Sequence, residues 1–239
     1  MLGTALAFTL IPVLAAAGSG IVAAVRRPGR RVTSALQHFA AGVVFAAAAI
    51  ELLPRVLEQA PWVAILGFAA GIVVMFSFRT FSDRAERHRE RHGLQGLPIG
   101  LATATGIDFF IDGIILGAGF TAATTTGVLL TIALAIEYLF VGLSLSATLA
   151  GKTSRRVVAA APVALALLTV LGTAIGVVTM SGASPPLLAA VLAFGAVAFM
   201  YLAAEELLVE AHAQGETALG SVGFFIGFLI YLIINELIA

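Results

Sequence analysis

The chain has 239 residues, of which 60% are hydrophobic and only 11% are charged, whereas about 25% of the residues in an average soluble domain are charged. Lys and Arg together balance Asp and Glu, so there is no net charge to favour binding of nucleic acid. The absence of cysteine excludes disulfides, thiolate metal sites and cysteine nucleophiles. The composition therefore predicts a protein embedded in the lipid bilayer, and the length favours a single transmembrane domain over residues 1–239.

Apolar stretches long enough to cross a bilayer recur along the whole sequence. A transmembrane helix needs about 20 mostly apolar residues, and eight segments satisfy this requirement. The predicted spans cover approximately residues 2–25, 33–54, 61–80, 97–120, 124–149, 156–179, 186–212 and 218–238. No basic region precedes the first of them, so we interpret it as a spanning helix and not as a cleaved signal peptide. The sequence thus predicts an all-α polytopic membrane protein with eight transmembrane helices.

Basic residues gather in three of the connections between the predicted spans. Four arginines follow the first span, five more lie around the connection after the third, and Lys152, Arg155 and Arg156 follow the fifth. Lys and Arg are concentrated in the cytoplasmic loops of membrane proteins. This pattern predicts that both termini lie outside, that residues 81–96 form a cytoplasmic loop, and that the protein is a multi-pass component of the cell (inner) membrane.

Two distant segments of the sequence align without a gap. They are "FAAGVVFAAAAIELLP" at residues 39–54 and "FGAVAFMYLAAEELLV" at residues 194–209, in which Glu51 matches Glu206. The first lies in span two and the second in span seven, which cross the membrane in opposite directions. We therefore expect a 3+2+3 inverted repeat around spans four and five, an arrangement typical of transporters that bind substrate near the midplane. Chance similarity between two apolar helices is the alternative.

The stretch "GIDFFIDGIILG", residues 106–117, carries two carboxylates inside an apolar span. Asp108 and Asp112 are one helical turn apart and share a face, and a rise of 1.5 Å per residue places Glu137 of span five at about the same depth. Spans four and five contain no Lys, Arg or His. Carboxylates at mid-membrane without basic partners are typical of functional sites, and an all-oxygen ligand set suits a divalent cation. The alternative is a group of protonated acids that join helices by hydrogen bonds.

Further acids and histidines extend from this depth towards both membrane surfaces and could line a cation path. The candidate path residues are His38, Glu51, Glu205, Glu206, Glu210 and His212. Each of them has a simpler interpretation, either exposure at the membrane interface or a hydrogen bond between packed helices. Because Glu205 and Glu206 are adjacent, their side chains diverge by about 100° on a helix, so we expect only one of them to face the path.

Two other features bear on the predicted site. His88 and His92 are four residues apart in the third connection and could capture a metal ion in the cytoplasm, although such a basic run is also typical of a segment near anionic lipid. Gly113, Gly117 and Gly142 are small residues beside the carboxylates. We expect them to let spans four and five pack closely.

At these residues the chain resembles the ZIP (Zrt-, Irt-like) family of divalent metal transporters, as a divergent bacterial-type member. "HFAAGVVFAAAAIELLP" is similar to the family's second span, "DFFIDG" to its fourth-span signature and "FMYLAAEELLVEAH" to its seventh span. The resemblance implies eight spans, both termini outside and a metal site on spans four and five. It also implies a transporter, not an enzyme, that often forms a homodimer and moves zinc, iron or manganese as its substrate without a bound cofactor.

The chain departs from the family pattern at the metal ligands. The fourth-span signature is His-Asn-x-x-Glu/Asp-Gly; Asp112 matches its acidic position, but Asp108 stands where the family has His. Glu137 takes the ligand position of span five, and span six offers only Thr169 or Thr173 where an acid is frequent. The implied ligand set is one site of three carboxylates, which favours manganese or iron over zinc.

The sequence leaves other functions to be weighed against metal transport. The carboxylates could carry protons in a proton-linked permease for a small solute, or the protein could bind metal without transporting it. An intramembrane hydrolase would need a nucleophile or a metal-bound water, and the sequence shows neither a midplane histidine nor an evident Ser–His pair. We expect transport of a divalent metal towards the cytoplasm through Asp108, Asp112 and Glu137, with the lipid bilayer and the metal as partners.

Overall fold

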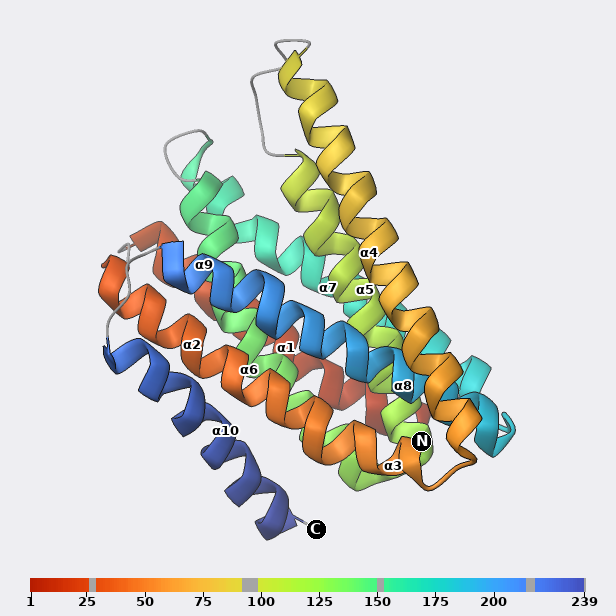
Figure 1. The fold of residues 1–239 in the computed structure, drawn as a ribbon. Coiled ribbons are helices and arrows are strands. Elements are labelled where there is room, and N and C mark those ends of the chain that lie inside the picture. Colours follow the sequence, from red (N-terminus) through yellow and green to blue (C-terminus); the bar gives the residue numbers. More distant parts are fainter. Residues whose placement is uncertain (26–28, 92–98, 150–152, 214–217, 239) are drawn as a thin grey trace.

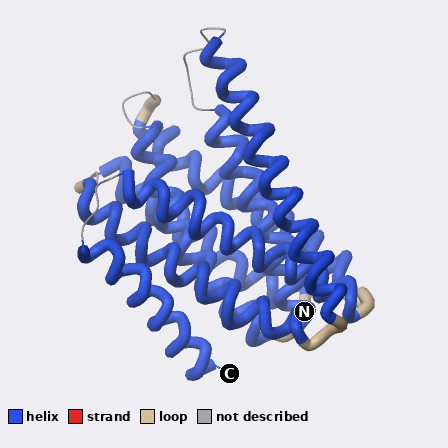
Figure 2. The backbone as a smooth tube through the Cα atoms, viewed as in Figure 1, coloured by secondary structure: helices blue, strands red, loops and turns tan. Residues whose placement is uncertain are grey.

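The computed structural model describes residues 1–25, 29–91, 99–149, 153–213 and 218–238. These residues are helical with short connections, and no strand occurs among them (Figure 2). In chain order, the elements are α1 (Leu2–Val25), α2 (Arg30–Ala46), η1 (Ala47–Leu52), α3 (Leu53–Leu57), α4 (Pro61–Arg91), α5 (Ile99–Ala122), α6 (Thr124–Leu149), α7 (Arg155–Met180), α8 (Pro185–Tyr201), η2 (Leu202–Leu207), α9 (Leu208–Ala213) and α10 (Ala218–Ile238), where η1 and η2 are π-helical.

The helices account for all eight predicted spans. Within the described residues, six helical runs are long and apolar enough to cross a membrane, and the apolar parts of the other two, Pro61–Ser77 and Val222–Ile238, are shorter. Helix α4 continues to Arg91, so the first part of the predicted cytoplasmic connection at 81–96 is helical. The polar run "SDRAERHRER" contains neither Gly nor Pro, so nothing in it ends a helix before Gly93.

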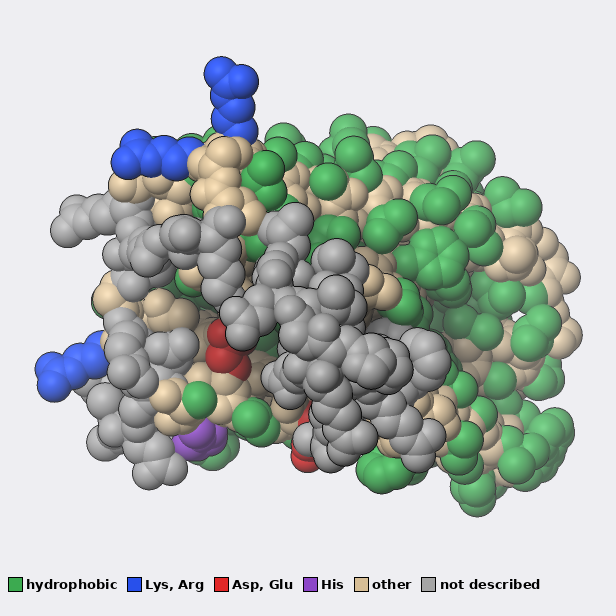
Figure 3. Space-filling view, turned by 90° about the horizontal axis from the view of Figure 1, so that it is seen from above, with side chains coloured by type: hydrophobic (Ala, Val, Ile, Leu, Met, Phe, Trp, Pro, Cys, Tyr) green, Lys and Arg blue, Asp and Glu red, His purple; other side chains and the backbone are tan. Residues whose placement is uncertain are grey.

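The helices run back and forth along one long axis, and the two termini lie at the same end of the bundle (Figure 1). The exposed Arg31, Arg155 and Arg156 stand at the start of α2 and of α7, after α1 and α6 have each crossed to the other end. Figure 3 shows basic side chains and a histidine gathered towards one side of the view, whereas hydrophobic side chains cover much of the remainder. The molecule therefore has a basic end opposite its termini.

Small residues determine where the helices approach most closely. A Cβ atom added to Gly113 or Gly117 of α5 would lie less than 3 Å from the backbone of α7, and one added to Gly142 of α6 would meet Ser19 of α1. Small residues allow such close approach in lipid, where packing drives helix association. The expectation that these glycines join spans four and five was wrong, because Gly113 and Gly117 face span six and Gly142 faces span one.

Two parts of the chain repeat the same local structure. The π-helical segments 47–52 and 202–207 fall at matching positions of the two aligned sequence segments, with an offset of 155 residues at both ends. Each follows a helix that is packed against a Gly-x-x-x-Gly pair: α8 against Gly67 and Gly71 of α4, and α2 against Gly223 and Gly227 of α10. The helices α2 and α8 run in opposite directions (Figure 1). Both the backbone and its packing partners are thus repeated.

Candidate metal site

Three carboxylates meet where α5 packs on α6. One oxygen atom from each of Asp108, Asp112 and Glu137 lies within 4.8 Å of the other two. Asp112 and Glu137 are buried and Asp108 is half-buried. The i,i+4 spacing on α5 places both aspartates on one face, and α6 presents Glu137 to that face. In the part of the chain that the structure describes, no other group of three acidic or histidine side chains is this compact.

Glu137 is the most unusual member of this group. Both of its carboxylate oxygens are fully buried and receive no hydrogen bond from a described donor group, and Asp112 is close enough to share a proton with them. An ionised carboxylate that is removed from water without a partner is strongly destabilising. Burial of Glu137 beside two further acids therefore requires either a bound proton or a bound cation, and the distances to Asp108 and Asp112 suit a shared cation.

Tyr138, which we did not single out from the sequence, holds one of the carboxylates. Its hydroxyl donates to Oδ2 of Asp112 at 3.3 Å and lies 2.6 Å from Oγ1 of Thr169 on α7. The ring stacks on Phe109, with centroids 3.8 Å apart. Thr169, the candidate ligand of span six, thus reaches the site through Tyr138. The sequence offered one signal for this hydrogen bond to Asp112, which is that Tyr138 directly follows Glu137. The signal is weak, because a tyrosine in an apolar span is also common where it only packs against other side chains.

A cavity of about 360 Å³ extends from Asp108 towards the basic end of the molecule, and Glu206 and Glu210 form part of its wall. Glu206 is close enough to interact electrostatically with all three carboxylates of the cluster. Glu210 accepts a hydrogen bond from Ser144 of α6. Glu205 does not line this cavity. An acidic passage therefore leads from the cluster along η2 and α9.

The two candidate histidines of spans two and seven lie near each other and outside the carboxylate cluster. The centroids of the His38 and His212 rings are 5.0 Å apart. His38 is buried, and its Nδ1 lies 2.8 Å from the carbonyl oxygen of Ser34. The contact between the two rings therefore links α2 to α9, whereas the Nδ1 contact stays within α2. The side chain of His88 and all of His92 lie outside the described residues.

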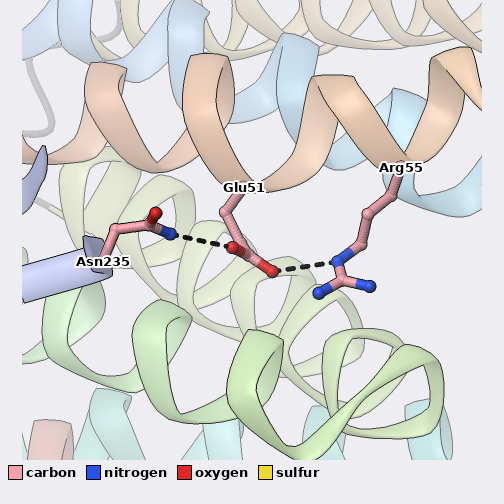
Figure 4. Close-up of polar contacts among 3 residues, drawn as sticks. All are labelled: Glu51, Arg55 and Asn235. Carbon is pink, nitrogen blue, oxygen red and sulfur yellow. Dashed lines mark hydrogen bonds and ion pairs between the residues drawn. The ribbon is translucent and has the colours of Figure 1, made fainter. Parts of the chain in front are cut away.

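Glu51, the remaining candidate path residue, forms a separate polar group near the terminal end of the bundle. Its carboxylate accepts a hydrogen bond from Nε of Arg55 at 2.9 Å and another from Nδ2 of Asn235 on α10 at 3.2 Å (Figure 4). Glu51 is buried, and Arg55 is about one third exposed. The structure therefore pairs Glu51 with a cationic side chain instead of bringing it to the three carboxylates.

The comparison with family models gives a match to the family described as ZIP zinc transporter, over residues 82–235. This range covers more than half of the chain and includes all three clustered carboxylates as well as Glu206. No curated protein matched the chain. The helical membrane architecture, the buried acidic cluster and the extent of the match agree, and the chain belongs to the ZIP zinc transporter family, whose members carry divalent metal ions across membranes.

Proposed function

We propose that this protein moves a divalent metal ion across the inner cell membrane towards the cytoplasm, and that Asp108, Asp112 and Glu137 bind the ion near mid-membrane. The observation that carries the proposal is Glu137, a buried carboxylate that receives no hydrogen bond from a described donor group and has an oxygen within 4.8 Å of an oxygen of each of two aspartates. In a chain of this family, a divalent cation is the ligand that best balances such a cluster.

The direction of transport is supported by the position of the cavity. It links Asp108 with Glu206 and Glu210 and continues to Ala213, at the end of α9. The exposed arginines at that end mark it as cytoplasmic under the positive-inside rule. Both termini then lie outside, and the two repeated halves cross the membrane in opposite directions. The cavity corresponds to an inward-facing release path.

The identity of the metal follows from the chemistry of the ligands. Asp108, Asp112 and Glu137 supply only carboxylate oxygens, and Tyr138, which donates to Asp112, adds a hydroxyl. Oxygen ligands favour harder ions, whereas imidazole favours zinc. We therefore propose Mn²⁺ or Fe²⁺ as preferred substrates over Zn²⁺. Competition among these ions for uptake tests the order, and a clear preference for Zn²⁺ would contradict it.

Uptake of Mn²⁺ into vesicles that contain the purified protein tests the site. Asp112→Asn and Glu137→Gln keep side-chain size but remove a negative charge, so we expect each to lower uptake by roughly tenfold or more, at least as much as loss of a group that only orients a metal ligand. Glu58→Gln, an exposed acid at the end of α3, is the matched control and should transport normally. Unchanged uptake in both site variants would refute the assignment.

Two other outcomes would point to the alternative functions. Binding of Mn²⁺ that is lost in Glu137→Gln, without any uptake by the unmodified protein, would indicate a metal-binding member that does not transport. A pH-driven flux of a small solute that needs no metal would indicate a permease. We also propose a homodimer, as is frequent in this family, and light scattering of the detergent-solubilised protein measures the number of subunits.

A further inference from the structure

The two repeated halves carry opposite charges at one pair of equivalent positions. With the offset of 155 residues that relates η1 to η2, Glu51 corresponds to Glu206, and Arg55 corresponds to Glu210. The second half thus carries two acids one helical turn apart, and the first half carries an acid and a base. The backbone is repeated, but the charge at the second position is reversed.

On the cytoplasmic side, these positions form part of an open passage. Glu206 and Glu210 line the cavity of about 360 Å³ that reaches Asp108, together with Met75 of α4. The wall therefore comes from η2, α9 and α4, beside α5 and α6.

On the terminal side, the equivalent elements are closed. Arg55 and Asn235 both bind the carboxylate of Glu51, and together they join α3, η1 and α10 (Figure 4). Tyr231, one turn before Asn235, is buried and close enough to Glu51 to interact with it electrostatically. Its hydroxyl has no hydrogen-bond partner among the described residues. When Gly67 and Gly71 of α4 are aligned with Gly223 and Gly227 of α10, Met75 is equivalent to Tyr231. Met75 lines the open cavity on the cytoplasmic side, and Tyr231 is its buried equivalent on the terminal side.

We propose that Glu51 is a second cation-binding residue, at the outer entrance of the path, and that Arg55 is its built-in counter-ion. In the inward-facing state, the guanidinium of Arg55 and the amide of Asn235 occupy the carboxylate and close the entrance. A divalent cation that arrives from the terminal side replaces Arg55 on Glu51, and the gap between η1, α3 and α10 opens towards the central site. This assignment rests on the proposed transport function.

The physical reason for a basic residue here is charge balance. A buried carboxylate needs a partner in the closed state, and an arginine on the same helix supplies one at i,i+4 spacing without a metal ion. Arg55 is partly exposed, so its guanidinium can turn into solvent when a cation takes its place. Glu210 in the equivalent position leaves the cytoplasmic passage acidic, which favours movement of a cation through it.

Thiol labelling of single-cysteine variants tests the gate, because the natural chain contains no cysteine. The reporters are Tyr231→Cys at the closed entrance and Met75→Cys at the equivalent place in the open cavity. A membrane-impermeant reagent should label Met75→Cys from the basic end and should label Tyr231→Cys only slowly from the terminal side. Adding Arg55→Ala should accelerate labelling of Tyr231→Cys several-fold, whereas adding Glu58→Gln should have no effect.

A charge exchange separates the ion pair from other effects of the substitution. The combination Glu51→Arg with Arg55→Glu retains the pair and should restore slow labelling of Tyr231→Cys. Mn²⁺ on the terminal side should accelerate labelling when Glu51 is present and should have no effect with Glu51→Gln. If Tyr231→Cys does not fold, Ile234→Cys on the same helix serves as the reporter.

If Tyr231→Cys is labelled equally slowly with and without Arg55, while Met75→Cys reacts, the proposal that Arg55 closes the entrance is overturned. A labelling rate of Tyr231→Cys that Mn²⁺ does not change, although Glu51 is present, would overturn the cation site. Neither measurement requires metal uptake, so failure of this proposal is distinguishable from failure of the transport site, which is tested by Asp112→Asn and Glu137→Gln.

Discussion

At the residue scale, the cluster is defined by how each carboxylate is held. Asp112 is oriented by the hydroxyl of Tyr138, which also reaches Thr169, so three helices fix its position. Glu137 is buried without any such partner, and Asp108 faces the cavity. One carboxylate is therefore preorganised, one depends on the cation or a proton for its partner, and one can exchange the ion with the passage.

Tyr138→Phe tests this preorganisation. The substitution removes the hydroxyl but leaves the ring that stacks on Phe109. Groups that orient a metal ligand typically contribute 10–100-fold to affinity, so we expect Mn²⁺ to bind about tenfold more weakly to the purified protein, with little loss of thermal stability. Titration calorimetry measures the affinity. Thr179→Val is the control, since the Thr179 hydroxyl binds only its own helix, and an affinity unchanged by Tyr138→Phe would exclude the role.

At the element scale, the bundle depends on close contacts between pairs of helices. The glycines of α5 lie against the backbone of α7, and a similar contact joins α6 to α1 at Gly142. These pairs place α1, α5, α6 and α7 in one tightly packed group that carries the carboxylates. The π-helical segments η1 and η2 stand in the other helices, and they contain Glu51 and Glu206, which we place at the entrance and along the release path that we propose. Such segments are frequent at functional sites.

Gly113→Ala tests the contact between α5 and α7. A Cβ atom at this position would lie less than 3 Å from backbone atoms of α7, which cannot move as a flexible side chain does. Overpacking of this kind costs about 1–3 kcal/mol, so we expect a lower midpoint of thermal unfolding in detergent. Gly100→Ala on the same helix is the matched control, because nothing lies within 4 Å of its Cβ position. Equal unfolding midpoints for the two variants would show that the contact tolerates a methyl group.

At the scale of the whole molecule, the charge distribution and the path of the chain both support the orientation that we propose. The termini share one end, and exposed arginines at the helix starts mark the other (Figure 1). The cavity extends to the basic end, and the Glu51–Arg55 pair, which we propose as the outer gate, lies towards the terminal end. The two ends of the path thus differ in charge and in openness although the two halves of the chain repeat the same helices.

Labelling of whole cells tests the orientation. Ser184→Cys lies at the start of α8, at the end that holds the termini, and Ser154→Cys lies at the start of α7, at the basic end; both positions are exposed. We expect an impermeant thiol reagent to modify Ser184→Cys in intact cells and Ser154→Cys only after the membrane is permeabilised, as the positive-inside rule requires. The opposite pattern would reverse the direction that we propose for transport.

The sequence by itself determined the eight helices and the position of the acidic cluster. Without water to satisfy the backbone, a long apolar segment in a bilayer must be helical, and helical spacing then places Asp108 and Asp112 on one face at the depth of Glu137. Only the tertiary structure decided which helices touch. It directed Gly113 towards α7 and the Tyr138 hydroxyl to Asp112, and it paired Glu51 with Arg55 and Asn235. Periodicity specifies the face on which a side chain stands, but the partner that covers this face depends on the packing of all the helices together.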